Sequence, residues 1–542
     1  MKSQENETMW PACLRSGLFS SIATTAAAAM FALSIPAVAT GQGYICAEGG
    51  GNPGNGDWAP SVFGWMVDKA EQANVIILGI SGSDATATAA FNAAGANSVT
   101  NLAVNATNAD TQSVYDQITT ADIVWIRGGN QWNYVNLWGD TLTEQAIRDV
   151  FDAGGVVGGS SAGCAIMGSI IYDSQFGSLS PRQALQNPYH PFLTFTTDFL
   201  ELTPGVLFDT HFTERGRLGR LIVQLGRYAS DTGEDILAIG VDDRTALCIY
   251  PDGTAEVRGE AAVTFLHLTN ESQLEIEPNE TPVVTHVRHT QLTEGYTYDL
   301  NSRQVIARPD HAVMTGPSTI TPDFNITSVN GSLMGDRLKG EYWVDDDGSA
   351  FALFDGALDI LPGQNRLQGA IISTNVWASN NFAENRTGGP QYAIKEHPHR
   401  MALYLDTGVQ LQAREPAFLD VKPATTTLES AFLLLDAHEM ISTAQTTYWS
   451  SNNFSVGPRQ SVAIENAMLH ALRSGMSYNA LTHDLAVTGD LTGDGVVNVF
   501  DLLMLLDQWG TCSNPDLCPA DLTEDGQVNV FDLLMLLDNW GS

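Results

Sequence analysis

Residues 154–163 read Gly-Gly-Val-Val-Gly-Gly-Ser-Ser-Ala-Gly, and this stretch decides the fold. A helical pattern over 142–152 ends at the first two glycines, and the paired valines begin a short apolar strand. Ser161 stands at a tight turn before a helical run over 162–171, between small residues that let the backbone close around it. This order is typical of a nucleophile elbow, in which the helix N-terminus and the Ala162 amide stabilise an oxyanion.

Strand-like apolar runs alternate with helical patterns through residues 45–270. Residues 75–80 read Val-Ile-Ile-Leu-Gly-Ile, and residues 123–126 read Ile-Val-Trp-Ile before a glycine pair. We expect the amide of Gly129, in that pair, to be the second oxyanion donor. Continuous apolar strands separated by helices indicate a parallel sheet covered on both faces. The sequence therefore predicts an α/β domain with a doubly wound sheet.

The composition excludes two classes of protein. The chain of 542 residues has 62 acidic and 25 basic side chains, a formal net charge of −37. A field this negative repels phosphate backbones, which excludes sequence-independent nucleic-acid binding and favours cations, either metal ions or basic substrates. A hydrophobic content of 44% is that of a folded protein and excludes a wholly disordered acidic chain.

The N-terminus is expected to be an export signal. Lys2 and Arg15 precede an apolar core, and Ala37 and Ala39 fit a cleavage site. An uncleaved membrane anchor is the alternative, but the core is short for a span. We expect a signal peptide over 1–39 and a bacterial product that is secreted or periplasmic, or held at the cell surface, without membrane association after cleavage.

The cysteines fall into two groups. Cys512 and Cys518 lie close together in a loop-like stretch, which in an exported chain indicates a local disulfide, with a metal-binding pair as the alternative. Cys46, Cys164 and Cys248 are expected to be unpaired or buried.

Residues 271–480 are expected to form a β-rich accessory region, to which the sequence assigns no function. β-like runs and Asn-Gly and Asp-Gly turn signals recur through it, and two helices are expected near 427–441 and 461–474.

A serine nucleophile needs a base and a group that orients the base. His211 lies in a dense polar segment ahead of a helix for which Thr213 is the expected N-cap. Asp243 follows the next strand and is the expected third member, with Asp242 and Asp173 as rivals. We therefore expect a Ser-His-Asp triad.

Four segments together resemble cyanophycinase, which is related to aspartyl dipeptidase among serine peptidases built like class I glutamine amidotransferases. The segments are Gly128-Gly-Asn-Gln131, Gly159-Ser-Ser-Ala-Gly163, Asp209-Thr-His-Phe-Thr-Glu-Arg-Gly-Arg-Leu-Gly-Arg220 and Ile239-Gly-Val-Asp-Asp243. The resemblance covers residues 43–270 and implies a flavodoxin-like parallel sheet with helices on both faces. It also implies Ser161 as nucleophile, His211 as base and Asp243, where the family usually has Glu, as orienting acid.

In that family, the glutamine after the glycine pair and the polar residues around the histidine line the substrate pocket. The matching positions are Gln131, Asp209, Arg215, Arg217 and Arg220. For Arg217 and Arg220, a structural role in ion pairs is the alternative. Thr210 stands where the family commonly has Gln, a departure at a position that contributes to the pocket.

The resemblance implies a serine peptidase that hydrolyses cyanophycin, an arginine-bearing poly-aspartate, to β-aspartyl-arginine dipeptides. The reaction would proceed through an acyl-enzyme without a catalytic cofactor. Two alternatives stay open. One is an aspartyl peptidase or isopeptidase of the same family with another substrate, and the other is an inactive surface protein whose C-terminal tail mediates assembly.

The C-terminal end is a duplicated calcium-loop unit. Residues 490–510 read DLTGDGVVNVFDLLMLLDQWG, and residues 521–541 read DLTEDGQVNVFDLLMLLDNWG. Oxygen donors at this spacing around a central Gly bind Ca²⁺, so two calcium sites are expected. The expected ligands, with Val496 and Gln527 acting through their carbonyls, are Asp490, Thr492, Asp494, Val496, Asn498, Asp501, Asp521, Thr523, Asp525, Gln527, Asn529 and Asp532.

A duplicated loop followed by an apolar helix resembles a type I dockerin, here over residues 488–542. The helices expected at 500–506 and 531–537 cannot bury their apolar faces alone, so they pair with each other or with a partner. Dockerins bind cohesins, which implies a cohesin-type protein partner, although free-standing dockerin-like tails also occur.

Overall fold

The computed structural model describes residues 43–54 and 58–310, and parts of the chain beyond. Those parts are 313–315, 327–328, 336–340, 358–361, 370–374, 376–377, 390–391, 394, 401–406, 408–414, 417–423, 428–447, 459–512, 518–523 and 525–541. The signal peptide expected over 1–39 lies outside the described residues. None of the described helices combines the length and the apolar character that a membrane span needs.

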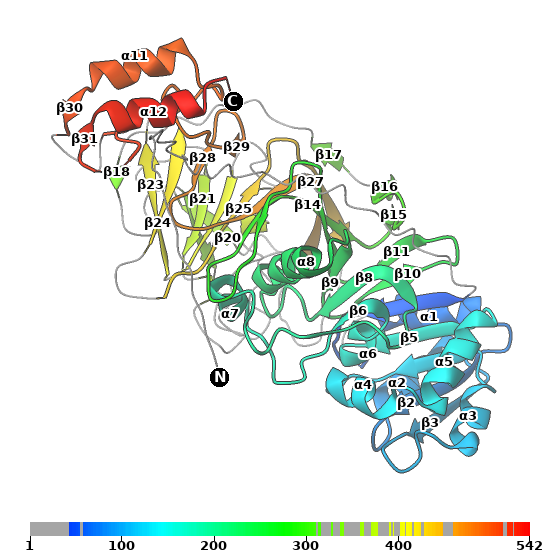
Figure 1. The fold of residues 1–542 in the computed structure, drawn as a ribbon. Coiled ribbons are helices and arrows are strands. Elements are labelled where there is room, and N and C mark those ends of the chain that lie inside the picture. The colour runs from blue at the N-terminus through cyan, green and yellow to red at the C-terminus, as the bar shows by residue number, and fades with distance from the viewer. Residues whose placement is uncertain are drawn as a thin grey trace, which may run out of the picture. The chain divides into compact units, whose positions relative to one another are not determined.

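A nine-stranded sheet forms the N-terminal α/β part (Figure 1). Its strands are β1 (Tyr44–Glu48), β2 (Asn74–Gly79), β3 (Ser98–Ala103), β4 (Ile123–Ile126), β5 (Val156–Ser160), β10 (Thr245–Ile249), β11 (Thr254–Gly259), β15 (Thr297–Asp299) and β16 (Gln304–Ala307). Five of them run parallel in the order β1-β5-β4-β2-β3, and the other four extend the sheet beyond β1 as antiparallel strands.

Helices cover both faces of this sheet, as the sequence predicts. Val75 and Ile77 of β2 belong to one core, and Ile76 and Leu78 to the other, because successive strand residues point to opposite faces. The first core includes residues of α1 (Ala59–Lys69) and α2 (Ala85–Ala94). The second includes residues of α3 (Gln112–Ile118), α4 (Gln131–Trp138) and α5 (Leu142–Asp152).

The helix expected over 162–171 is much shorter in the structure. It ends after one turn as α6 (Ala162–Ala165), and the chain continues as β6 (Gly168–Tyr172). β6 pairs in parallel with β8 (Thr203–Thr210) in a second sheet. The β-branched pair Ile170 and Ile171 favours a strand once a pairing partner is present, and this overrides the helical pattern.

The second sheet carries the chain from the α/β part into the accessory region. Its central strands are β9 (Leu237–Val241), β12 (Ala262–Leu268), β14 (Val283–Thr293), β27 (Arg459–Leu472) and β25 (Phe432–Asp436), in the order β8-β9-β12-β14-β27-β25. β12 and β14 pair across residue 270, where the sequence suggested a domain boundary. The division of the chain there stays a prediction.

The prediction of two helices near 427–441 and 461–474 is wrong. β25 and β27 occupy these positions, and the described residues of the accessory region confirm its β-rich character. The Leu, Ala, Met and Glu residues in both segments favour helix locally. β27 pairs with β14 and with β25, and these long-range ladders outweigh local propensity.

α8 (Leu218–Thr232) follows the polar segment around His211. Arg217, not the expected Thr213, is its N-cap. The backbone N–H of Thr213 donates instead to the carboxylate of Asp242, 2.8 Å away. Thr213 therefore belongs to the turn before the helix.

The C-terminal repeats each end in a helix, α11 (Val499–Asp507) and α12 (Val530–Asp538), as expected. The two strands β30 (Gly510–Thr511) and β31 (Gln527–Val528) pair across the repeats, and a shared core contains Val497, Leu505, Val528 and Leu536. The expected disulfide joins Cys512 and Cys518, and the other described cysteines are free and buried.

Phe265 of β12 stacks on Tyr298 of β15 and so connects the two sheets, with ring centroids 4.1 Å apart. Both side chains are buried. We predict that Phe265→Ala lowers the free energy of unfolding by about 3–5 kcal/mol, because a cavity opens between the sheets. The measurement is the midpoint of the first urea transition of the full chain. Phe265→Leu is the control, and equal midpoints for both variants would contradict this packing role.

Candidate active site

Ser161 occupies a strained turn between β5 and α6. Its φ is +53°, in the left-handed region that non-glycine residues rarely adopt. The flanking glycines permit this turn, because a Cβ on Gly163 would lie 2.1 Å from the carbonyl oxygen of Ile126 and one on Gly159 would lie 2.7 Å from the carbonyl carbon of Gly163. The elbow predicted from sequence is therefore present, and its glycines are required by close backbone contact.

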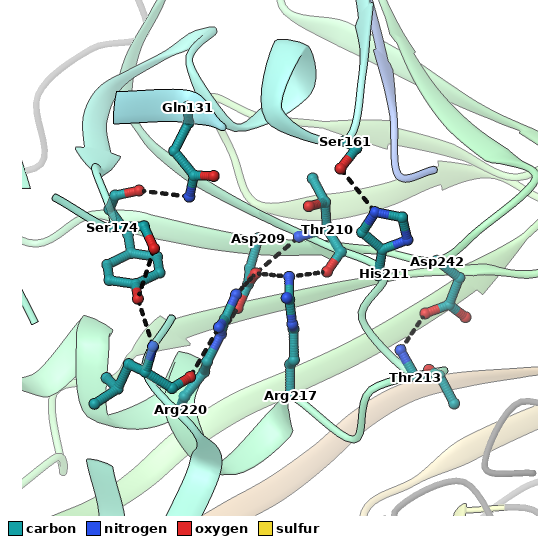
Figure 2. A network of polar contacts seen from close by, with 12 residues as sticks. Gln131, Ser161, Ser174, Asp209, Thr210, His211, Thr213, Arg217, Arg220 and Asp242 are labelled. Carbon is teal, nitrogen blue, oxygen red and sulfur yellow. Dashed lines mark hydrogen bonds and ion pairs between the residues drawn. The ribbon is translucent and has the colours of Figure 1, made fainter. Parts of the chain in front are cut away.

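His211 lies directly after β8 and faces this serine (Figure 2). Its Nε2 is 2.7 Å from the Oγ of Ser161, within hydrogen-bonding distance. The ring position depends on a sharp turn, since His211 has a φ of +48° and its N–H donates to the carbonyl of Gly49 at 3.0 Å. The geometry allows His211 to accept the proton of Ser161.

Asp243 lies on the other side of the imidazole, after β9. Its Oδ1 is 2.5 Å from Nδ1 of His211, close enough for the carboxylate to orient the imidazole and to stabilise its protonated form. Burial lowers the pKa of His211, and Asp243 offsets part of this effect. Burial also opposes ionisation of Asp243, but His211 and Arg244 outweigh it and lower the pKa of Asp243.

The two rival carboxylates are engaged elsewhere. Asp242 accepts hydrogen bonds from the backbone N–H groups of Thr213 and Ala262, and burial raises its pKa to about 7. Asp173 accepts from the hydroxyls of Thr194 and Thr196. Of the three carboxylates, Asp243 is the one that contacts His211.

Two further buried carboxyl groups lie near Asp243. Burial is the main cause that raises the pKa of Glu48 and Glu214 well above the ordinary range, and the charge of Asp243 raises both further. Glu48 accepts from the N–H of Gly50 at 2.9 Å. Because the protonated forms of Glu48 and Glu214 are favoured, the negative charge beside the imidazole is concentrated on Asp243.

Gly50 is a site residue that the sequence analysis missed. A Cβ there would lie 2.2 Å from Cε1 of His211 and 2.4 Å from Oδ1 of Asp243. The backbone after β1 therefore closes over the His–Asp pair, and any side chain would displace it. The run Gly49-Gly-Gly51 was the available signal for such close contact.

The glycine pair expected in the oxyanion hole lies close to the nucleophile. A Cβ on Gly128 would be 3.4 Å from Cβ of Ser161, and the hydroxyl of Tyr134 donates to the carbonyl of Arg127 and so holds this loop. Ala162 is the first residue of α6, directly after Ser161. The roles of the Gly129 and Ala162 amides stay predictions.

A cavity of about 600 Å³ opens beside Ser161 and His211. It has charge of both signs in its wall, because Arg127 and Asp84 both line it. The Nη2 of Arg127 donates to the carbonyl of Ser81 at 2.7 Å, while its Nε is buried without a hydrogen-bond partner among the described groups. A substrate that carries both a carboxylate and a cation matches this wall.

Four of the five residues expected to line the substrate pocket take part in a network of polar contacts, namely Gln131, Asp209, Arg217 and Arg220 (Figure 2). Gln131 donates from its side chain to the carbonyl of Tyr172 at 3.1 Å. Asp209 is buried and accepts two hydrogen bonds from Arg220, at 2.6 and 2.5 Å, and one from Arg217 at 3.1 Å. Arg215 is half-buried, and burial lowers its pKa. None of these residues is among those that line the 600 Å³ cavity.

The Asp209 network supports the backbone just before His211. Asp209 accepts from the N–H of Thr210 at 2.8 Å, and Nη1 of Arg217 donates to the carbonyl of Thr210 at 2.5 Å. Burial opposes ionisation of Asp209, but Arg220 and Arg217 outweigh it and lower its pKa. The buried charges therefore position the turn that carries the imidazole.

The first C-terminal loop brings its carboxylates together. Oxygens of Asp490, Asp494 and Asp501 all lie within 4.8 Å of one another, and Asp501 is fully buried. Three hard oxygen donors at this separation fit Ca²⁺. Asn498 uses Oδ1 to cap α11 and directs Nδ2 toward Asp494, so its expected contact with the ion would run through water, as is common at this loop position.

The second loop repeats the backbone hydrogen bonds of the first, in which Asp490 accepts from Gly495 and Asp501 from Thr492. Asp521 accepts from the N–H of Gly526 at 2.8 Å, and Asp532 accepts from the N–H of Thr523 at 2.9 Å. Asn529 caps α12 as Asn498 caps α11. Gly495 and Gly526 have φ values of +85° and +84°, so glycine is required at the sharp turn of each loop.

Comparison with known proteins places these features in families. Residues 84–256 match Peptidase family S51, and residues 488–539 match the Dockerin type I domain. The cyanophycinase of Synechococcus elongatus is 26% identical over 202 residues, which cover 36% of this chain and 59% of that protein. The cyanophycinase of Trichormus variabilis (strain ATCC 29413 / PCC 7937) is 29% identical over 187 residues, which cover 34% and 58%.

The chain thus spans less than two thirds of the length of these relatives. Among solved structures, that of a peptidase from an acI-B1 Actinobacterium has 15% sequence identity and a TM-score of 0.34, over 48% of this chain and 98% of the other. Both resemblances drawn from the sequence motifs are confirmed. The chain carries a peptidase family S51 domain and, at its C-terminal end, a dockerin type I domain.

Proposed function

We propose that the chain is an exported serine peptidase that hydrolyses aspartyl peptide bonds, with cyanophycin as the first candidate substrate. The observation that carries the proposal is the alignment of Ser161, His211 and Asp243 beside a cavity, with 2.7 Å between the serine and the imidazole and 2.5 Å between the imidazole and the carboxylate. This is the arrangement that activates a serine for acyl transfer.

In the proposed reaction, the Oγ of Ser161 attacks a carbonyl carbon of the aspartyl main chain while Nε2 of His211 takes the proton. The C–N bond breaks, the leaving amine receives that proton, and the acyl group stays on Ser161 as an ester. Water then attacks the ester, with His211 again as base, and restores Ser161. Release of β-aspartyl-arginine leaves the β-amide intact, so the bond broken is the main-chain peptide bond.

The cavity wall supports a substrate of mixed charge. Each unit of cyanophycin has a guanidinium group and each released dipeptide has free carboxylates, and the wall contains Arg127 and Asp84. Arg127 matches a carboxylate and Asp84 matches a guanidinium. In this proposal, the amides of Gly129 and Ala162 bind the oxyanion.

A second candidate is an aspartyl peptide or isopeptide other than cyanophycin. Asp209, Arg217 and Arg220 are buried in their own ion network and are not among the residues that line the cavity. Thr210 beside them is buried as well. A pocket that lacks these groups selects its substrate by different contacts, and this observation supports the second candidate.

The proposed protein is exported and built from separate modules. We propose an S51 peptidase domain over 43–270, an accessory region over 271–480 and a dockerin domain over 488–542. The dockerin domain would hold two calcium ions and dock onto a cohesin-type protein, so that the peptidase acts outside the cytoplasm or at the cell surface. The sequence pattern at 1–39 supports export.

The first test is hydrolysis of insoluble cyanophycin and of soluble aspartyl peptides by the mature chain. We predict release of dipeptides and a loss of at least about 10³-fold in kcat for Ser161→Ala, because the nucleophile is removed. Ser174→Ala is the matched control and should retain activity. Hydrolysis of soluble peptides alone would assign the second substrate class, and no hydrolysis of any substrate would refute both.

The pH dependence provides a second test. Burial lowers the pKa of His211, so the neutral, proton-accepting imidazole prevails above its usual value of about 6.5. We expect kcat/KM to fall only on the acid side of that value and to stay level up to about pH 8. Asp243→Asn should lower kcat/KM by about 10³–10⁴-fold. It should also move the acid limb of the profile to lower pH, because Asp243 raises the pKa of the imidazole. An acid limb that moves to higher pH in this variant would contradict the assignment of Asp243 as the partner of His211.

Calcium binding is tested by calorimetry on the full chain. We predict two calcium ions per chain that EDTA removes, and one ion for Asp501→Asn, because Asp501 is the buried carboxylate of the first loop. Asp507→Asn, which changes an exposed acid at the end of α11, is the matched control and should retain both ions. Unchanged stoichiometry in Asp501→Asn would refute the loop assignment.

A further inference from the structure

Two imidazoles and one carboxylate form a cluster in the C-terminal half of the chain. The residues of this cluster belong neither to the triad nor to the calcium loops. Asp436 ends β25, and His438 follows it in a turn. His483 lies in the turn between β28 (Ser477–Asn479) and β29 (Asp484–Leu485). One ligand atom from each of these three residues lies within 4.8 Å of the other two.

Two hydrogen bonds orient the buried carboxylate of Asp436. It is 4% exposed, and its Oδ2 accepts from the hydroxyl of Tyr478 at 2.5 Å. The N–H of His438 donates to Oδ1 at 2.9 Å. A hydroxyl that orients a carboxylate from behind is the support that metal-binding carboxylates usually have.

The two imidazoles lie on the side of Asp436 toward solvent. Their rings are stacked, with centroids 4.1 Å apart and planes 13° from parallel. Nδ1 of His483 is 2.8 Å from Oδ2 of Asp436, a separation that suits a hydrogen bond or two ligands of one ion.

We infer that Asp436, His438 and His483 bind one divalent transition-metal ion, with Zn²⁺ as the best match and water completing the coordination. Two imidazole nitrogens and one carboxylate are a donor set for zinc, whereas Ca²⁺ requires oxygen donors. His438 is exposed and His483 half-buried, so an ion can enter from solvent.

The site would join two separate sheets. β25 belongs to the large second sheet, whereas β28 and β29 belong to a five-stranded sheet. A bound ion therefore links the end of one sheet to a turn of the other, directly before the first calcium loop at Asp490. A ligand that binds only the folded chain stabilises it, so zinc should raise the temperature at which this region unfolds.

The test uses the full mature chain with excess Ca²⁺, so that the calcium loops are saturated. Zn²⁺ is the probe, added after chelation and followed by calorimetry, with Co²⁺ absorption as a report on nitrogen ligation. We expect one zinc ion per chain, and a weakening of at least about tenfold for His438→Ala. The matched control is Glu439→Gln, an exposed acid next to the site, which should bind zinc as the parent does.

His438→Ala is the deciding variant, because removal of this exposed side chain leaves the contact between Tyr478 and Asp436 in place. His483→Ala provides a second measurement, accepted where its circular dichroism matches the parent. Absence of stoichiometric zinc binding in the parent chain, or equal affinity in parent and His438→Ala, would overturn the inference. A Co²⁺ spectrum that is the same in the parent and in His438→Ala would overturn it as well.

Discussion

The contact on which the peptidase site depends is the approach of α6 to the end of β4. A side chain at Gly163 would meet the carbonyl oxygen of Ile126 at 2.1 Å, so the helix lies directly against the sheet. This contact forces the chain to turn within one residue, and Ser161 takes the positive φ that results. The serine thereby lies at the carboxyl edge of the parallel strands, where sites in such sheets form.

Buried charge holds the backbone of this site in position. Asp209, Arg217 and Arg220 satisfy one another inside the protein and fix Thr210, the residue before the imidazole. Removing one partner from such a network costs about 3–5 kcal/mol, because an unpaired charge stays buried. The arrangement couples the stability of the fold to the placement of His211, since the same contacts determine both.

Much of this could be predicted from the sequence, for identifiable reasons. The continuous apolar run at 75–80 indicates a strand buried on both faces, and the glycines around Ser161 indicate a sharp turn. The prediction of a helix over 461–474 failed because the residues there favour helix locally. In the structure they form β27, which is hydrogen-bonded to a neighbouring strand on each side. The burial of Arg217 and Arg220 and the closure of Gly50 over the His–Asp pair depend on contacts between distant segments, which spacing along the chain does not reveal.

The pairing of β12 with β14, and of β14 with β27, also affects how the peptidase domain can be isolated. β12 is an apolar strand that reads Ala-Val-Thr-Phe-Leu-His-Leu, and β14 covers one of its edges along its whole length. A chain that stopped at residue 270 would leave this edge open to pairing with other molecules, which leads to aggregation. The accessory strands therefore act as a protective cover, and a soluble catalytic fragment has to include both β14 and β27.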